Sequence, residues 1–204
     1  MPLLAFRRHA ACLFVAGALC LAAWPSAAQP TADDAARLIQ GVSQKVIDLV
    51  KSKTGADRQA GIRQVLESEF DLAYMGRSAL GTHWERTPED LRERFLKAAA
   101  GAEARAYSER FGQYGGQTLA LGRVASRPNG VFMVDSRLNQ TSGEPIKIEW
   151  EVRDRGQGLR ISDVKIEGVS MVMTRRSDFN SYIQQHGGKV DALVQELEAR
   201  GARQ

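Results

Sequence analysis

The chain has 204 residues, of which 28 are lysine or arginine, 24 are aspartate or glutamate and 43% are hydrophobic. This composition suits a globular protein with a sizeable core. Without Arg7 and Arg8, which lie in an N-terminal segment that we expect to be removed, 26 basic residues stand against 24 acidic ones. This near balance of positive and negative charge excludes a strongly basic surface that follows the phosphates of a nucleic acid.

The first residues predict an export signal. Two arginines are followed by a mainly apolar stretch at 10–23, by the helix-breaking Pro25 and by the small residues 26–28. We expect cleavage after residue 28, which would leave 29–204 as the folded part in the periplasm. Two alternatives stay open: a membrane-spanning helix, for which the apolar run is short, and a lipoprotein anchor at Cys20.

The residue types needed for most catalytic and metal sites are scarce. Both cysteines, Cys12 and Cys20, lie in the predicted signal, so the folded part would have neither a disulfide nor a thiolate nucleophile. His83 and His186 lie far apart and lack the spacing of metal ligands. The sequence also lacks a nucleophile elbow and a phosphate-binding glycine loop. We therefore expect no catalytic residue, no metal and no cofactor.

Helical patterns occupy the first half of the folded part. Thr31 and Asp34 match a capping box, and apolar residues then recur at helical spacing as far as Val50. Polar residues and a glycine at 51–56 end this helix. A second apolar stripe follows at 62–70.

A third helix has strong start signals. Thr87 is the expected N-cap and Pro88 the expected first helical residue, and the apolar pattern runs to Phe111. Gly115 and Gly116 are expected to stop the helix.

The apolar period then changes to two residues, which predicts strands. In the last predicted strand the apolar phase slips between Ile161 and Val164, which indicates a β-bulge near Ser162 and Asp163. Four strands are predicted. The first begins at Leu119, and the other three cover 131–138, 146–153 and 159–167.

Two further helices are predicted at 171–183 and 190–197, with either Ser170 or Ser177 as the cap of the first. Short turns favour antiparallel pairing of consecutive strands. The sequence therefore predicts an α+β fold: an antiparallel sheet of about four strands flanked by N-terminal and C-terminal helices, in a single domain over 29–204.

Two carboxylates could serve as general bases in an enzyme built on such a sheet, which makes an isomerase or hydrolase an alternative function. Asp135 has strand neighbours that offer no acid or tyrosine partner, and Asp163 lies at the suspected bulge. These positions favour a binding protein over an enzyme.

Large apolar side chains and flexible, polarisable methionines are frequent. Such residues usually form a plain core, but methionine also adapts to ligands of irregular shape. They are Met75, Met133, Met171, Met173, Trp84, Trp150, Phe70, Phe95, Phe132 and Phe179.

Two segments carry a family resemblance. The first runs from Phe70 to Gly81 and continues with Trp84 and the helix of Phe95; the second runs from Asp163 to Phe179 and is followed by the closing helix. They resemble the MlaC family, also called the toluene-tolerance auxiliary proteins, across nearly the whole folded part. One branch of that family, HpnM, is associated with hopanoid-producing bacteria.

The resemblance implies an NTF2-like or cystatin-like fold and a monomeric periplasmic carrier. Such a carrier moves phospholipid between an inner-membrane ABC transporter complex, with its MCE-domain protein, and an outer-membrane lipoprotein complex, and so supports outer-membrane lipid asymmetry. A hopanoid-type lipid is an alternative cargo. A structural or chaperone-like module with a solid core is a third possibility.

The resemblance also implies which residues line the lipid pocket: Phe70, Met75, Leu80, Trp84, Phe95, Val169, Met171 and Val172. Strand alternation adds Phe132, Val134, Ile148, Trp150 and Val152. Arg77, Arg175 and Arg176 are candidates for contact with the head group. Family members often have a tyrosine where this chain has Thr174 and Arg175, which bears on head-group preference. We expect a hollow, hydrocarbon-lined interior between sheet and helices.

Overall fold

The computed structural model describes residues 29–156 and 158–203. The predicted signal and both cysteines lie outside these residues. The described helices are α1 (Ala32–Ser52), α2 (Gly55–Glu69), α3 (Leu72–Leu80), the 3-10 helix η1 (Gly81–Arg86), α4 (Glu89–Phe111), α5 (Met171–Gln185) and α6 (Val190–Ala202). The strands are β1 (Thr118–Arg127), β2 (Val131–Asn139), β3 (Ile146–Asp154), β4 (Leu159–Ile166) and β5 (Val169–Ser170).

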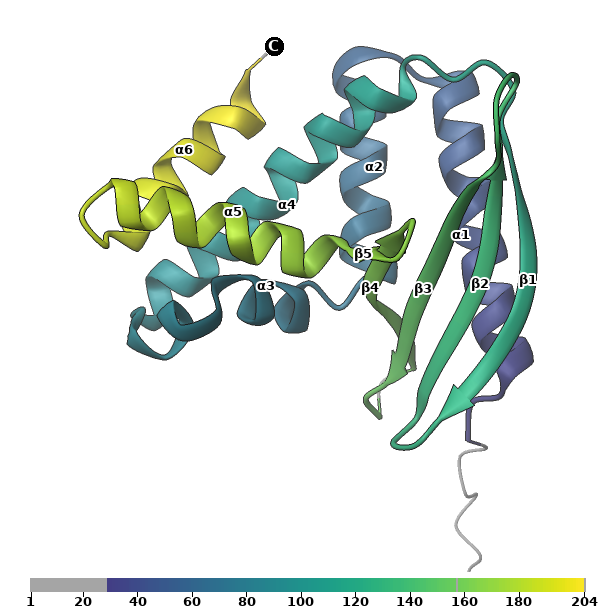
Figure 1. Cartoon of the computed structure of the whole chain (residues 1–204). Helices are drawn as coiled ribbons and strands as arrows, with labels where there is room; N and C mark the ends of the chain where they lie inside the picture. The colour runs from purple at the N-terminus through teal and green to yellow at the C-terminus, as the bar shows by residue number, and fades with distance from the viewer. Residues whose placement is uncertain (1–28, 157, 204) are drawn as a thin grey trace, which may run out of the picture.

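The strands form one antiparallel sheet in chain order, β1-β2-β3-β4-β5, with helices before and after it (Figure 1). The predicted α+β fold is therefore confirmed. The sheet has one strand more than predicted, because two residues after the β4 turn pair back onto β4 before α5 begins.

One face of the sheet, here called the inner face, packs against α1. Val134 on β2 and Val152 on β3 are fully buried there, together with Ile39 of α1. Strand neighbours of opposite phase, such as Lys147, point away from this core. Apolar and polar residues thus alternate in β2 and β3 because one face of the sheet is apolar and buried and the other faces solvent.

The predicted bulge is present in β4. Glu151 pairs with Asp163 and Val152 pairs with Ile161, so Ser162 is an extra residue on its strand. The buried Ser162 hydroxyl lies 2.7 Å from a carboxylate oxygen of Glu151 and 3.2 Å from the Glu151 carbonyl. Ser162 therefore lies on the same side of the sheet as Glu151 and Arg153, where it is buried but not unpaired.

The ends of α1 and α5 carry side-chain caps. Thr31 and Asp34 form the predicted capping box, with the Thr31 N–H donating to Asp34 at 2.8 Å. Their mutual hydrogen bonds and Arg37 hold the pKa of Asp34 at about 2. At α5 the Ser170 hydroxyl accepts from the Met173 N–H at 3.1 Å, which makes Ser170 the cap and leaves Ser177 inside the helix.

The apolar pattern of the third helix, α4, ends at Phe111 as predicted, but its predicted start was wrong by one residue and its predicted stop at Gly115 was wrong. Pro88 is the N-cap and helix residues begin at Glu89, because the buried Thr87 hydroxyl donates instead to the His83 carbonyl at 2.7 Å. The helix ends at Phe111 and its C-cap is Gly112, so it stops short of the predicted Gly115.

Residues 72–86 form two short helices, α3 and η1, where no helix was predicted. Asp71 caps α3 by accepting from the Tyr74 N–H at 3.0 Å. Gly81 ends α3 with a φ of 54°, and a Cβ there would lie 2.7 Å from Nε of Arg176. A larger residue would meet both backbone strain and the guanidinium.

The remaining helices form a second group beside the sheet (Figure 1). The long helix α4 packs against α2, α3 and α6, and α3 packs against α5. At the centre of this group the rings of Phe95 and Phe179 meet edge to face at 5.7 Å. Among the helices of the described residues, none has the length and apolarity needed to cross a bilayer.

Candidate functional site

Two apolar cavities interrupt the packing between helices and sheet. The helix cavity, about 110 Å³, lies among α2, α3, α4, α5 and β4. The sheet cavity, about 280 Å³, lies between α1, the end of α4 and the inner face of the sheet. Lining residues of the helix cavity include Met75, Phe95, Ala99, Val164, Met171 and Phe179, and those of the sheet cavity include Val42, Val46, Val50, Leu119, Ile148 and Trp150.

Side chains from α4 and from the sheet separate the two cavities. Tyr107 lines the helix cavity and Phe111, one turn later, lines the sheet cavity. Their rings stack with centroids 5.7 Å apart. On the sheet, Val164 and Trp150 are cross-strand partners: Val164 lines the helix cavity and Trp150 lines the sheet cavity. We call these four residues the dividing wall.

An ion pair lies at the edge of the helix cavity. Arg175 on α5 forms two hydrogen bonds with Glu103 on α4, one of them from Nη2 at 3.0 Å. The hydrogen bond to Glu103 raises the pKa of Arg175 and outweighs the opposing effect of burial. Burial, followed by the charge of Glu103, raises the pKa of Tyr107. Arg175 is therefore always charged and Tyr107 neutral at ordinary pH.

A wide polar groove of about 1530 Å³ lies beside the helix cavity, between α3 with η1 and the β3–β4 side of the sheet. Phe70, Leu72 and Val172 line both the groove and the helix cavity. An apolar interior thus lies next to a charged surface, with these three side chains between them.

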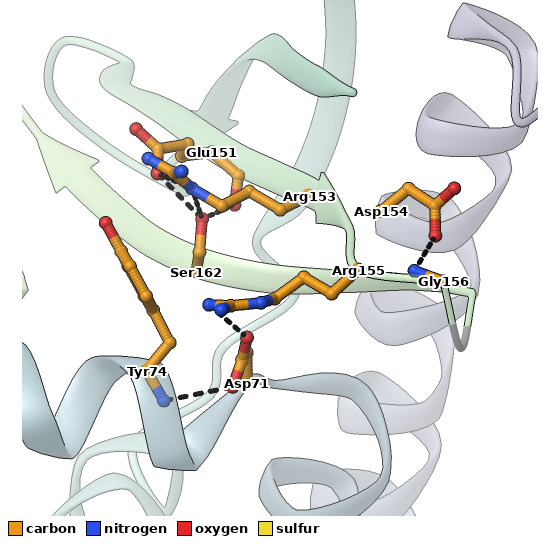
Figure 2. A network of polar contacts seen from close by, with 8 residues as sticks. All are labelled: Asp71, Tyr74, Glu151, Arg153, Asp154, Arg155, Gly156 and Ser162. Atoms are coloured by element: carbon orange, nitrogen blue, oxygen red, sulfur yellow. Dashed lines mark hydrogen bonds and ion pairs between the residues drawn. The ribbon is translucent and has the colours of Figure 1, made fainter. Parts of the chain in front are cut away.

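The groove contains a polar network that joins α3 to the sheet (Figure 2). The Tyr74 ring lies 4.8 Å from the guanidinium carbon of Arg153 and 5.4 Å from that of Arg155. Arg155 also faces Asp71 at 3.5 Å, while Arg153 donates to Glu151 at 2.8 Å. Burial lowers the pKa of Arg153, but the hydrogen bond and charge of Glu151, together with Tyr74 and Asp71, raise it by more. Arg153 therefore stays cationic.

The predicted pocket residues occupy five kinds of place. Phe70, Met75, Phe95, Met171, Val172 and Arg175 line the helix cavity, and Ile148 and Trp150 line the sheet cavity. Trp84, Arg77 and Arg176 line the polar groove. Leu80, Phe132, Val134 and Val152 lie in the packed core, whereas Val169 is 57% exposed.

Sequence reasoning missed the α4 half of the dividing wall. Tyr107 and Phe111 were treated as the ordinary apolar stripe of a helix. Two aromatic residues at i and i+4 stack on one helix face, and this spacing was the available signal. It does not show that a gap lies on each side of the stack.

The residues weighed for catalysis have structural partners. Asp163 accepts from the backbone N–H groups of Val164 at 2.8 Å and Val172 at 3.2 Å. Asp135 faces Arg123 at 4.0 Å. His83 contacts Asn180, and His186 stacks on Tyr182 at the end of α5. Within the described residues, His, Cys, Asp and Glu side chains form no cluster of three that could hold a metal ion.

Apolar cavities with a few converging polar groups are typical of proteins that bind a small molecule. The combination found here, hydrocarbon walls beside a charged groove, defines a class of α+β proteins suited to an amphipathic ligand. The chain belongs to the MlaC family: the family model described as "MlaC protein" matches residues 40–199. The resemblance seen in the sequence is therefore confirmed at the level of the family.

A solved structure has a similar fold. It is that of a phospholipid-binding protein from Ralstonia solanacearum, determined in complex with a phospholipid, and the superposition has a TM-score of 0.69. The match covers 83% of this chain and 97% of that chain at 22% sequence identity. At this identity the likeness shows the fold alone.

Proposed function

We propose that this protein is a periplasmic phospholipid carrier rather than an enzyme, and that residues 29–204 act as one lipid-binding domain. The observation that carries the proposal is the pair of apolar cavities between helices and sheet, one of which lies next to a charged groove. Membership of the MlaC family and the phospholipid bound by the Ralstonia solanacearum protein support it.

The physical need for such a carrier is large. Each methylene transferred into water costs ~0.8 kcal/mol, so a lipid with ~32 methylenes would face roughly 25 kcal/mol. Cavities walled by Met75, Phe95, Met171 and Trp150 offer the chains an apolar surrounding. Such a carrier needs only to bind and release its cargo, and no covalent step is required.

The two cavities are smaller than a complete lipid. A water molecule occupies about 30 Å³ in the liquid, and a methylene group is of similar size. The helix cavity of about 110 Å³ and the sheet cavity of about 280 Å³ therefore hold roughly four and nine such groups. Loading a two-chain lipid requires the walls to separate, and the adaptable methionines of the helix cavity suit such a movement.

The proposed route follows from the predicted export signal and the family. After cleavage at residue 28 the protein would collect or deliver lipid at an inner-membrane ABC transporter complex and exchange it with an outer-membrane lipoprotein complex. A monomer suffices for this role. A hopanoid-type lipid is the alternative cargo.

The test is to express the full chain with its signal, purify the protein from the periplasm without detergent, and extract and weigh its small molecules by mass spectrometry. We expect about one two-chain phospholipid per protein. A stoichiometric hopanoid would replace phospholipid as the cargo. A periplasmic protein that carries neither, and that takes up neither from vesicles, would refute the proposal.

A further inference from the structure

The carboxylates beside Arg160 in the polar groove already have partners. Asp71 caps α3 and faces Arg155, and Glu151 accepts from Arg153. Asp154 accepts from the Gly156 N–H at 2.9 Å, as Figure 2 shows. Asp163 accepts from two backbone N–H groups. Little acceptor capacity is left for another cation in this part of the groove.

Arg160 on β4 is a cation of this groove with a buried nitrogen that lacks a partner. It lines the groove, and its Nη1 is shielded from solvent without a hydrogen-bond acceptor among the described residues. A buried charged N–H group without an acceptor is costly, and such groups in native proteins call for a ligand, water or ion.

The position of Arg160 in the sheet increases this cost. Its direct cross-strand partner is Arg153 on β3, so two guanidinium groups stand opposite one another. Like charges in this arrangement destabilise a sheet. Arg153 is relieved by Glu151, and no carboxylate does the same for Arg160 among the residues described. Arg155, at 3.5 Å from Asp71, adds a third cation nearby.

An anion at this point would lie next to hydrocarbon. The groove meets the helix cavity at Phe70, Leu72 and Val172. A molecule that satisfied Arg160 and also filled the helix cavity would carry an oxyanion close to the start of an acyl chain. Guanidinium groups match phosphate oxygens in geometry and bind them through paired, charge-assisted hydrogen bonds.

We propose that Arg160, with Arg153 and Arg155 around Tyr74, forms an oxyanion site that holds the phosphate of the lipid whose chain enters the helix cavity. This site differs from the head-group residues expected from the sequence, Arg77, Arg175 and Arg176. It rests on the proposed function, because the phosphate is bound as part of a lipid. It makes Arg160 a specificity-determining residue for phosphorylated over neutral lipids.

The test compares two single-chain probes that differ only by the phosphate: 1-palmitoyl lysophosphatidate and 1-palmitoylglycerol. The full-length protein is purified, stripped of lipid and titrated with each probe below its micellar concentration, using tryptophan fluorescence or calorimetry. We expect the phosphorylated probe to bind at least about tenfold more tightly. Glycerol 3-phosphate, which has the phosphate without the chain, should compete only at much higher concentration.

Variants then assign the preference to one residue. Arg160→Gln should bring the ratio of the two affinities close to one while leaving the affinity for 1-palmitoylglycerol unchanged. Arg160→Lys should keep part of the preference, since it retains the charge. Arg137→Gln removes an exposed arginine of β2 outside the groove and should leave the ratio as in the natural chain.

The outcomes separate the two proposals. If the natural protein binds both probes equally, or if Arg160→Gln folds and keeps the full preference, the oxyanion site is refuted while the carrier function stands. Glycerol 3-phosphate binding as tightly as the lysolipid would reassign the site to a free phosphate ester. If neither probe binds the natural protein, the carrier function itself fails.

Discussion

The helix cavity and the sheet cavity are both lined in part by α4, yet the polar residues at their edges differ. The helix cavity has the Arg175–Glu103 ion pair at its edge and lies next to the polar groove. The sheet cavity is larger and mainly apolar, and its polar lining residues include the amides Gln113, Gln117 and Gln140 and a single charged residue, Arg110. If an amphipathic ligand binds here as proposed, we expect its charged end at the groove side of the helix cavity and its chain directed toward the sheet.

The dividing wall decides whether the two cavities act as one. It consists of two pairs of side chains, because Tyr107 stacks on Phe111 along α4 and Val164 faces Trp150 across the strands, with one member of each pair in each cavity. Rotation or withdrawal of these side chains would join the cavities.

The largest effect is expected from a charge in the sheet cavity. Trp150→Asp replaces an indole, whose N–H donates to the Ser136 hydroxyl at 2.9 Å, by a carboxylate without a partner. An unpaired charge repels acyl chains, so lipid retained after purification should fall at least about tenfold. Mass spectrometry of the extracted lipid measures this.

Trp150→Phe is the matched control, since it keeps an aromatic apolar ring and removes the N–H and the second ring of the indole without adding a charge. It should retain most of the lipid. The Asp variant should still be exported, because residue 150 lies far from the predicted signal. Unchanged lipid content in Trp150→Asp would show that the sheet cavity does not hold the chain.

Removal of the wall is expected to have the next largest effect. Tyr107→Ala deletes the ring that stacks on Phe111, and we expect the space that it leaves to join the two cavities. Loss of a large aromatic ring from a packed site costs about 3–5 kcal/mol in the free energy of unfolding, but lipid binding should persist. Urea denaturation measures the stability, and a shift of the extracted lipids toward longer chains would report the merged cavity. A loss of all lipid from the folded variant would contradict this role of the wall.

A smaller effect is expected from filling the helix cavity. Ala99 on α4 lines that cavity, so Ala99→Leu places methyl groups in empty space. Filling a cavity commonly stabilises a protein by about 1 kcal/mol, and here it should also reduce bound lipid. Thermal unfolding and lipid extraction should therefore change in opposite directions.

Ala60→Leu on the exposed side of α2 is the control for Ala99→Leu, because it adds the same atoms outside both cavities. It should change neither the lipid content nor, to any great extent, the unfolding temperature. If Ala99→Leu and Ala60→Leu retain equal amounts of lipid, the helix cavity is not part of the binding site.

The fold was predictable where a local pattern and its cause coincide. Alternation in β2 and β3 reflects burial of one face, as at Val134 and Val152, and the slip in phase marked the bulge at Ser162. The start of α4 was not predictable in this way. Thr87 has the residue type of a cap, but a contact with the His83 carbonyl takes its hydroxyl.

The candidate site was predictable only in part, because a gap in packing has no local signature. Alternation identified the inner face but not which of its residues border empty space: Trp150 lines a cavity, while Phe132 and Val134 are packed core. Arg175 was expected to meet a head group. Its pairing with Glu103, 72 residues away, depends on how α4 and α5 cross.

The smallest predicted effect is a pH-dependent change in stability that comes from the Tyr107 hydroxyl in the dividing wall. Burial raises the pKa of Tyr107 above its ordinary value of 10.0, so the folded chain favours the neutral phenol. The stability that this preference provides is fully present below pH 10 and is lost as the pH rises through the raised pKa. Tyr107→Phe cannot ionise and should escape this loss. The difference in unfolding temperature between Tyr107→Phe and the natural chain should therefore grow in favour of the variant from pH 8 to pH 11, as measured by circular dichroism. A difference that stays constant over this range would mean that the phenol is solvated and that the wall between the two cavities is wet.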